Sequence, residues 1–159
     1  MPIYAYQFAI GKIWIEEQDG KIISLGRDFY QLEETEVCET ALIKQVKQEL
    51  DEYFAQTRTK FSFPIHLKGP SFYLKVWEEM LNIPYGKTMT YGALAKKLNT
   101  KAVRAVGGAC RNNKLMLVVP CHRVIGANGK LTGFYGGLDM KVKLLDLENN
   151  QDYEPRKHE

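Results

Sequence analysis

Residues 61–71, FSFPIHLKGPS, separate two segments of the chain with different residue patterns. This stretch has two prolines and a glycine without helical periodicity, so it predicts a connector in which His66 has a structural rather than a catalytic role. Apolar and polar residues alternate over 3–26, whereas the pattern after the connector is mainly helical. We therefore expect an α+β chain of two small domains, residues 1–68 and 69–150, followed by a polar tail at 151–159.

The first segment predicts an antiparallel meander covered by one helix. Asp19-Gly20 lies between two short apolar runs, which is typical of a hairpin turn. Over residues 36–56 the apolar positions recur at helical spacing, and the expected helix packs them against the sheet. These positions are Val37, Ala41, Leu42, Val46, Leu50, Tyr53 and Phe54. This half of the chain is expected to be a scaffold.

Basic residues are concentrated in the second segment. Residues 1–68 hold 8 Lys and Arg against 11 Asp and Glu, a net charge of −3, whereas residues 69–159 hold 14 against 8, a net charge of +6. Residues 85–143 hold 11 basic residues against a single acidic one, Asp139, a net charge of +10. Such segregation favours a polyanionic partner, nucleic acid first, although a solvated lysine-rich surface would have the same composition.

The second segment also predicts two short helices joined by a tight turn. A preceding helix is expected over residues 71–81. Thr90 can then cap the first short helix, and Thr100 can cap a second that runs to about Arg111. In the most basic part of the chain, this pattern indicates a helix-turn-helix.

The second short helix has small residues on one face. They are Ala102, Ala105, Gly108 and Ala109, with Gly107 beside them. Interior glycines cost a helix roughly 1 kcal/mol each, so close approach of another group is expected in return. That group is either a DNA backbone or groove wall, or a helix of the protein itself.

The stretch LMLVVPCHRVIGANG, residues 115–129, places a cysteine and a histidine side by side after an apolar run. Residues 115–119 are expected to be extended and buried, and Pro120 ends the run. Burial would raise the pKa of the Cys121 thiol and make it inert, whereas the basic neighbours His122 and Arg123 favour the thiolate. Because adjacent side chains tend to point apart, His122 would reach the sulfur through a loop bend or a bridging water. From the residues alone, Cys121 could be either a reactive thiol or an inert buried one.

Other classes of function are disfavoured. No apolar run approaches the roughly 20 residues that cross a bilayer, and MPIYAYQFAIGKIW lacks a basic leader with an apolar core. The cysteines at positions 38, 110 and 121 cannot all pair with one another, and they form no Cys-x-x-Cys or Cys/His cluster. We therefore expect a cytoplasmic protein with no metal, no cofactor and no membrane partner.

The runs IPYGKTMTYGALA, RAVGGACRNN and PCHRVIGANGKLTGFYGGL resemble the 6-O-alkylguanine-DNA alkyltransferases. The resemblance is continuous from about residue 72 to 148, and the first segment matches only in layout. It implies a winged-helix-like helix-turn-helix domain that binds double-stranded DNA containing alkylated guanine. It further implies a monomeric repair protein, associated with the nucleoid when bound, that flips the damaged base and moves its alkyl group irreversibly to its own cysteine.

The resemblance assigns roles to individual residues. Cys121 takes the place of the alkyl acceptor, and His122 takes that of the water-linked base that maintains the thiolate. Glu148 matches the glutamate that orients this histidine. Tyr91 matches the tyrosine that protonates the departing guanine and helps to rotate the nucleotide outward. Arg104 matches the arginine that enters the gap left by the flipped base.

Glu148 also has a requirement that follows from its position. It stands at the C-terminal end of a helix expected over 138–147, where the helix macrodipole disfavours a carboxylate unless a cation is its partner. Further DNA contacts are assigned by resemblance to Thr90, Lys101, Ala102 and Asn113. Asn113 also matches the asparagine that steadies the turn below the cysteine.

The substrate pocket is assigned by resemblance to Val124, Phe134 and Tyr135. Family members usually have tyrosine and then a small residue at the last two positions, so this chain has lost a hydroxyl and gained a large ring. The family's contact at the second position is a backbone N–H, which Tyr135 keeps. The departure therefore bears on the width of the pocket more than on the reaction. Cys110 is interpreted as a small core residue, and Cys38 has no assigned role.

Three other functions fit part of the pattern. A noncatalytic lesion-binding relative would lack the acceptor cysteine, which is present here. A cysteine hydrolase would need an oxyanion hole and would release free enzyme. A helix-turn-helix regulator would read bases in the major groove and prefer one DNA sequence.

Overall fold

The computed structural model describes residues 1–27, 36–129 and 137–148 of the 159-residue chain. It divides into two compact units. The first consists of Met1–Lys68 with Lys114–Met116, and the second of Gly69–Asn113 with Leu117–Glu159. A sheet with one helix forms the first unit and the second is mainly helical, which confirms the expected α+β class.

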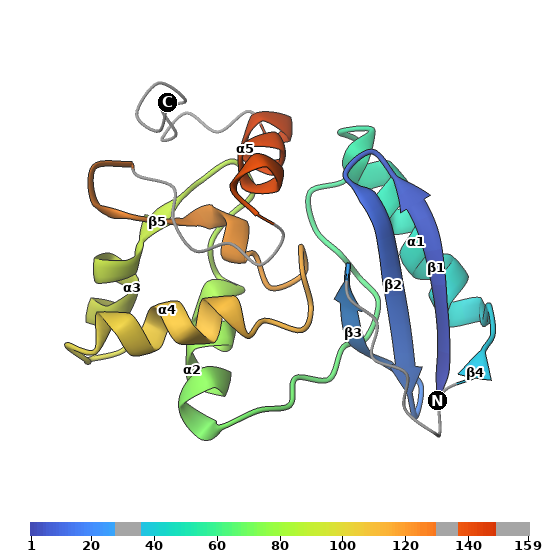
Figure 1. Cartoon of the computed structure of the whole chain (residues 1–159), viewed down its shortest axis with the longest axis horizontal. Helices are drawn as coiled ribbons and strands as arrows, with labels where there is room; N and C mark the ends of the chain where they lie inside the picture. Colours follow the sequence, from blue (N-terminus) through green and yellow to red (C-terminus); the bar gives the residue numbers. More distant parts are fainter. Residues whose placement is uncertain (28–35, 130–136, 149–159) are drawn as a thin grey trace. The chain divides into compact units, whose positions relative to one another are not determined.

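The first unit contains a four-stranded sheet in the order β3-β2-β1-β4 (Figure 1). The strands are β1 (Pro2–Phe8), β2 (Gly11–Gln18), β3 (Lys21–Gly26) and β4 (Glu36–Val37). Strands β1, β2 and β3 pair antiparallel, which confirms the meander. Asp19 and Gly20 both have positive φ, 52° and 76°, the conformation that a two-residue type I′ hairpin requires.

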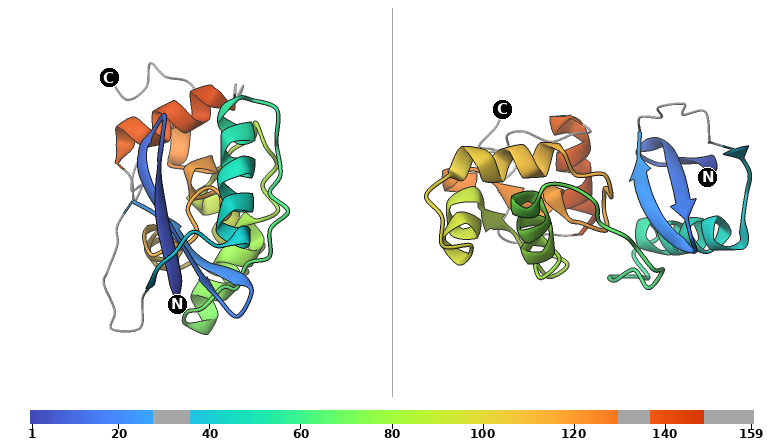
Figure 2. Two further views of the ribbon diagram at one scale, coloured as in Figure 1. Left: turned by 90° about the vertical axis from the view of Figure 1, so that its right-hand side faces the viewer. Right: turned by 90° about the horizontal axis from the view of Figure 1, so that it is seen from below.

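Helix α1 (Ala41–Phe54) covers one face of this sheet (Figures 1 and 2). The sequence predicted a helix from residue 36, and that start is wrong. Glu36 and Val37 instead pair parallel with β1 as β4. Thr40 then begins the helix, because its side chain accepts a hydrogen bond from the Ile43 N–H at 3.1 Å. The apolar spacing of α1 buries Ile43, Val46, Leu50 and Tyr53.

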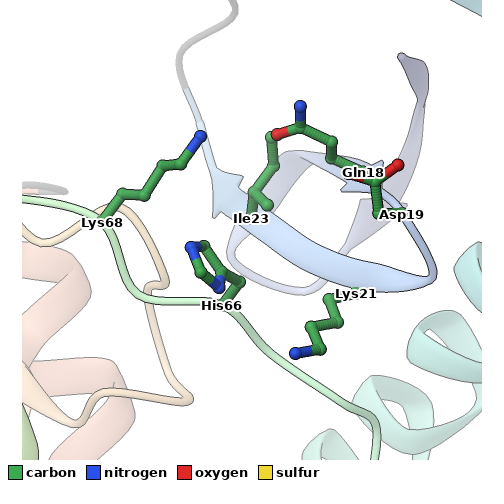
Figure 3. Close-up of a pocket in the computed structure, with 6 residues that line it drawn as sticks. All are labelled: Gln18, Asp19, Lys21, Ile23, His66 and Lys68. Atoms are coloured by element: carbon green, nitrogen blue, oxygen red, sulfur yellow. The ribbon is translucent and has the colours of Figure 1, made fainter.

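The connector runs beside β3. Ile22 donates to the Pro64 carbonyl and accepts from the His66 N–H, both at 2.9 Å. The exposed His66 side chain lies over a pocket of about 320 Å³ between the connector and the β2–β3 hairpin (Figure 3). The pocket is lined by Gln18, Asp19, Lys21, Ile23, His66 and Lys68.

The apolar run after Asn113 is not one extended segment, contrary to the prediction. The Leu25 N–H on β3 donates to the Lys114 carbonyl at 2.8 Å, and the Met116 N–H donates to the Leu25 carbonyl at 2.9 Å. Residues 114–116 therefore belong to the first unit. Leu117 then has a φ of 74°, which turns the chain back into the second unit. Residues 115–117 and 119 are buried as expected, while Val118 is half-buried.

The second unit is built around three helices that pack together: α2 (Ser71–Met80), α3 (Tyr91–Lys97) and α4 (Val103–Arg111) (Figure 2). Thr90 caps α3 as predicted, accepting from the Ala93 N–H at 3.0 Å. The predicted cap of α4 is wrong: Ala102 precedes the helix, and Thr100 instead accepts from the Ala102 N–H within the turn. The pair α3 and α4 with its short turn forms the expected helix-turn-helix.

The small residues of α4 permit close packing inside the protein at one position. A Cβ on Gly108 would lie 3.2 Å from the Tyr73 hydroxyl on α2. Nearby, the Trp77 indole N–H donates to the Ala109 carbonyl at 2.8 Å. Of the two interpretations open from the sequence, contact with a neighbouring helix therefore accounts for Gly108. Ala102 and Ala105 are exposed.

The remaining elements carry the cysteine stretch. They are β5 (Met89–Thr90), the 3-10 turn η1 (Cys121–Arg123), β6 (Val124–Ile125), a second 3-10 turn η2 (Ala127–Gly129) and α5 (Leu138–Leu147). Strands β5 and β6 pair parallel, which joins the segment before α3 to the segment after η1. Helix α5 packs against η1 and has the bounds that the sequence predicted.

Candidate active site around Cys121

Cys121 begins η1 and is held by backbone and side-chain hydrogen bonds. Its N–H donates to the Val119 carbonyl at 2.8 Å. The buried Asn113 amide nitrogen donates to that same carbonyl at 2.8 Å and to the Cys121 sulfur at 3.3 Å. The turn and the thiol are therefore fixed by one amide, and only 3% of Cys121 is exposed.

His122 lies next to the thiol in sequence and is oriented by a carboxylate. Its Nε2 lies 2.6 Å from Glu148 Oε2, and both side chains are fully buried. Because a carboxylate only accepts, Nε2 carries the ring proton in the neutral form. Among the described residues, Nδ1 has no hydrogen-bond partner. The basic lone pair of the neutral imidazole is therefore on Nδ1.

Arg123 supplies the cation that the position of Glu148 requires. Its Nε donates to Oε1 at 2.8 Å and its Nη2 to Oε2 at 3.0 Å, while Nη1 donates to the Ile83 carbonyl at 2.8 Å. The Gly86 N–H adds a bond to Oε1 at 3.3 Å. Burial alone would raise the pKa of Glu148, but His122 and Arg123 outweigh it and hold this pKa well below its usual value. Sequence reasoning had placed Arg123 beside the thiol rather than on Glu148.

Burial dominates the ionisation of both reactive groups. It raises the pKa of Cys121, against the opposing effects of the Asn113 amide and Lys141. It lowers the pKa of His122, although Glu148 opposes the shift. Both shifts favour the neutral form of the group concerned.

Lys141 is a site residue that sequence reasoning missed. It was counted only as part of the basic segment, yet it is fully buried on α5. Its ammonium donates to the Val124 carbonyl at 2.5 Å and lies 5.7 Å from the centre of the Tyr91 ring. The signal was available, because residues 141, 144, 145 and 148 have the i, i+3, i+4, i+7 spacing of one buried helix face.

The residues assigned to DNA divide into two groups. Lys101, Ala102 and Arg104 are exposed around the start of α4, and Thr90 is half-buried at the cap of α3. Asn113 is buried and lies with the cysteine instead. The exposed group lies on the helix-turn-helix, where long basic side chains can reach a phosphate backbone.

The structure describes two of the residues assigned to the substrate by resemblance and not the other two. Tyr91 is half-buried at the first position of α3, and Val124 is buried on β6 directly after η1. Phe134 and Tyr135 lie outside the described residues. Cys110 is buried on α4, 3.8 Å from the Met80 sulfur, and Cys38 is half-buried.

Two absences among the described residues concern metal sites and membrane-spanning helices. In residues 1–27, 36–129 and 137–148, no three His, Cys, Asp or Glu side chains come together as a metal site would require. Within the same ranges, no helix has the length and apolar character needed to cross a bilayer.

A helix-turn-helix unit that carries a buried cysteine beside a histidine–glutamate pair defines a DNA-binding protein with a nucleophilic site. The chain belongs to the 6-O-methylguanine DNA methyltransferase family. Residues 71–150 match the DNA binding domain of that family, and residues 3–67 match its ribonuclease-like domain.

Similar proteins cover between 71% and 94% of the chain. A methylated-DNA--protein-cysteine methyltransferase of Methanosarcina acetivorans is 39% identical over 150 residues, which cover 91% of this chain and 96% of that protein. One from Mycobacterium leprae is 44% identical over 114 residues, 71% of this chain and 69% of the relative. The crystal structure of Mycobacterium tuberculosis OGT in complex with DNA matches with a TM-score of 0.88 and 33% identity, covering 94% of this chain and 93% of that one.

Proposed function

We propose that the protein repairs DNA by transferring the alkyl group of 6-O-alkylguanine to the sulfur of Cys121. The observation that carries the proposal is the hydrogen-bonded arrangement around the thiol. Asn113 fixes the sulfur, and the adjacent His122 is oriented through Glu148 and Arg123. A nucleophile, a base and a group that orients the base are thereby held together in a buried site of a family named for this reaction.

The transfer needs two proton movements. Nδ1 of His122 takes the thiol proton, and a water molecule carries it across the gap between adjacent side chains. The thiolate then attacks the alkyl carbon in line with the oxygen that leaves, so a carbon–sulfur bond forms as the carbon–oxygen bond breaks. The Tyr91 hydroxyl supplies the proton that neutralises the departing guanine. The thioether has no acyl carbon for water to attack, so each molecule reacts once.

Access to the alkyl carbon requires the base to leave the duplex. The exposed Arg104 at the first turn of α4 enters the space left by the base. Lys101, Ala102 and Thr90 contact the DNA around it. Extrusion costs a few kcal/mol of stacking and pairing and less for a poorly paired lesion, which favours alkylated guanine. The protein acts as a monomer on double-stranded DNA in the cytoplasm, at the nucleoid.

The proposal is tested with duplex DNA that carries radiolabelled 6-O-methylguanine. We expect label to move to the protein up to one equivalent, and peptide mass spectrometry to find the methyl group on Cys121. Cys121→Ala should bind the duplex and take up no label. Cys38→Ala, which removes a half-buried thiol of the first unit, should react like the unchanged protein.

Four results would overturn the assignment. Loss of the lesion with position 121 unmodified would place the acceptor elsewhere. Lesion binding by the unchanged protein without any transfer would favour a noncatalytic binding protein. Release of free thiol with continued turnover of an ester would indicate a hydrolase, and strong preference for one undamaged DNA sequence would indicate a regulator.

A further inference from the structure

Lys141 lies between the segments that carry the acceptor and the proton donor. Its ammonium is fully buried and donates to the carbonyl of Val124, the residue directly after η1. It also lies 5.7 Å from the centre of the ring of Tyr91, within the range of a cation–π contact. A single side chain of α5 thus contacts both the β6 segment that follows Cys121 and the first residue of α3.

Four titratable groups on three other elements act on the Lys141 ammonium or lie against it. Cys121 and His122 belong to η1, Cys110 to α4, and Tyr91 to α3. Burial lowers the pKa of Lys141 to about 8, whereas ionised Cys121 or Cys110 would raise it. Burial raises the pKa of Cys121, and Lys141 opposes that shift. Lysine and acceptor thiol therefore favour each other's charged forms.

A purely structural role does not explain why the buried group is charged. A neutral side-chain amide could donate equally well to the Val124 carbonyl. Taking an ammonium out of water is far more costly than burying an amide that is hydrogen-bonded. The charge has a use where an anion develops nearby, and the reaction assigned to Cys121 passes through a thiolate.

We propose that Lys141 is a positioning residue for the transfer, whose ammonium holds the Val124 carbonyl and the Tyr91 ring in place and stabilises the Cys121 thiolate by its positive charge. This inference rests on the proposed function for the identity of the reaction. The interaction between lysine and thiol is a property of the protein without DNA.

Substitutions at position 141 separate the charge from the hydrogen bond. Lys141→Gln keeps a donor and removes the charge, whereas Lys141→Arg keeps the charge. Lys143→Gln is the matched control, because Lys143 is exposed on the same helix. The single-turnover rate of transfer is measured against pH at saturating methylated duplex, so that differences in DNA affinity do not enter.

We expect Lys141→Gln to raise the pH at which the transfer rate is half-maximal. At neutral pH the rate then falls about tenfold for each pH unit of that rise. Lys141→Arg should keep a midpoint near that of the unchanged protein, and Lys143→Gln should not move it. Equal midpoints for Lys141→Gln and Lys143→Gln in folded protein would overturn the proposal.

A second measurement needs neither transfer nor a substitution at Lys141. The Cε resonance of Lys141 is titrated by NMR in Cys121→Asp, which places an anion at the acceptor position, and in Cys121→Ala, which places none, with Cys110→Ala as the control. We expect the lysine midpoint to lie at higher pH in Cys121→Asp than in Cys121→Ala, because an anion at position 121 favours the charged ammonium, and Cys110→Ala should leave the midpoint unchanged, because burial keeps the pKa of Cys110 at about 12 and its thiol protonated. Equal midpoints in Cys121→Asp and Cys121→Ala would overturn the inference whether or not the protein transfers alkyl groups.

Discussion

Arg123 and Glu148 form a buried two-point ion pair, with Nε donating to Oε1 at 2.8 Å and Nη2 to Oε2 at 3.0 Å. The same carboxylate holds His122 through Oε2. The guanidinium therefore compensates the negative charge of Glu148, while Oε2 still accepts a hydrogen bond from the imidazole. Loss of either partner would leave a buried charge uncompensated.

Arg123→Met should destabilise the protein strongly. Removing one partner of a buried pair typically costs about 3–5 kcal/mol, because the other charge stays out of water. Arg111→Met, at an exposed position of α4, is the control and should change stability little. The free energy of unfolding is measured by urea denaturation at neutral pH. Equal losses for the two variants would show that Glu148 does not depend on Arg123.

The free energy of unfolding should decrease in acid because Glu148 becomes protonated. Because the pKa of Glu148 is held below its usual value in the folded protein, its contribution is complete above the unfolded pKa of about 4.3 and is lost as pH falls toward the folded value. Glu148→Gln should lower stability at neutral pH and flatten its dependence on acid. The measurement is the denaturation midpoint at several pH values, with the exposed Glu78→Gln as the matched control. A Glu148→Gln profile as steep as that of the control would contradict the expectation.

Asn113→Asp should make Cys121 less reactive than Asn113→Ala does. Alanine removes the amide that donates to the sulfur and to Val119, at a cost of roughly 1–3 kcal/mol, whereas aspartate adds a like charge beside the thiolate. Both changes should raise the pKa of Cys121, aspartate more. Alkylation of Cys121 by iodoacetamide against pH, followed by peptide mass spectrometry, reports the order. The control is Asn112→Ala, because the Asn112 side-chain amide donates to the Gly108 carbonyl and not to the sulfur. This variant should leave the pH profile of alkylation unchanged.

Arg104→Ala should slow repair of duplex DNA while leaving the thiol unaffected. The side chain is exposed on α4, so its removal does not change the hydrogen bonds of the buried site. Transfer from methylated duplex should decrease, and transfer from the free 6-O-methylguanine base, which needs no extrusion, should stay at its original rate. Equal decreases with both substrates would show that Arg104 does not act on base extrusion.

The stability gained by Gly108→Ala should be limited by a steric contact with Tyr73. Alanine favours a helix over glycine by about 1 kcal/mol, but its Cβ would lie 3.2 Å from the Tyr73 hydroxyl. In a Tyr73→Phe background that hydroxyl is gone, so the same change should stabilise the protein more. A double-mutant cycle of unfolding free energies measures the difference. Additive effects would show that the hydroxyl does not restrict the helix.

The local elements of the fold were predictable where one short-range rule decides them. Alternation and Asp19-Gly20 gave the meander, Thr90 capped α3, and apolar spacing gave α5 its bounds. The prediction failed where longer-range pairing competes. Residues 36–37 fit a helical pattern but gain a strand partner in β1, and residues 114–116 bond to β3.

The sequence named most of the residues that meet around Cys121 but not all of the hydrogen bonds that connect them. Family resemblance supplied Cys121, His122 and Glu148, and the structure brings the last two into contact. The macrodipole argument required a cation for Glu148 without naming it, because Arg123 is 25 residues away in sequence. The sequence did not predict a buried Lys141, because lysine side chains are almost always exposed to solvent.

The pairing of residues 114–116 with β3 has a consequence for dissection of the protein. A fragment that ends at Lys68 would keep all of β1 to β4 and α1, yet Leu25 would lose the backbone partners that Lys114 and Met116 provide. An open strand edge of this kind recruits other chains. Such a fragment is therefore expected to self-associate, and grafting the tripeptide back onto its C-terminus should restore a monodisperse product.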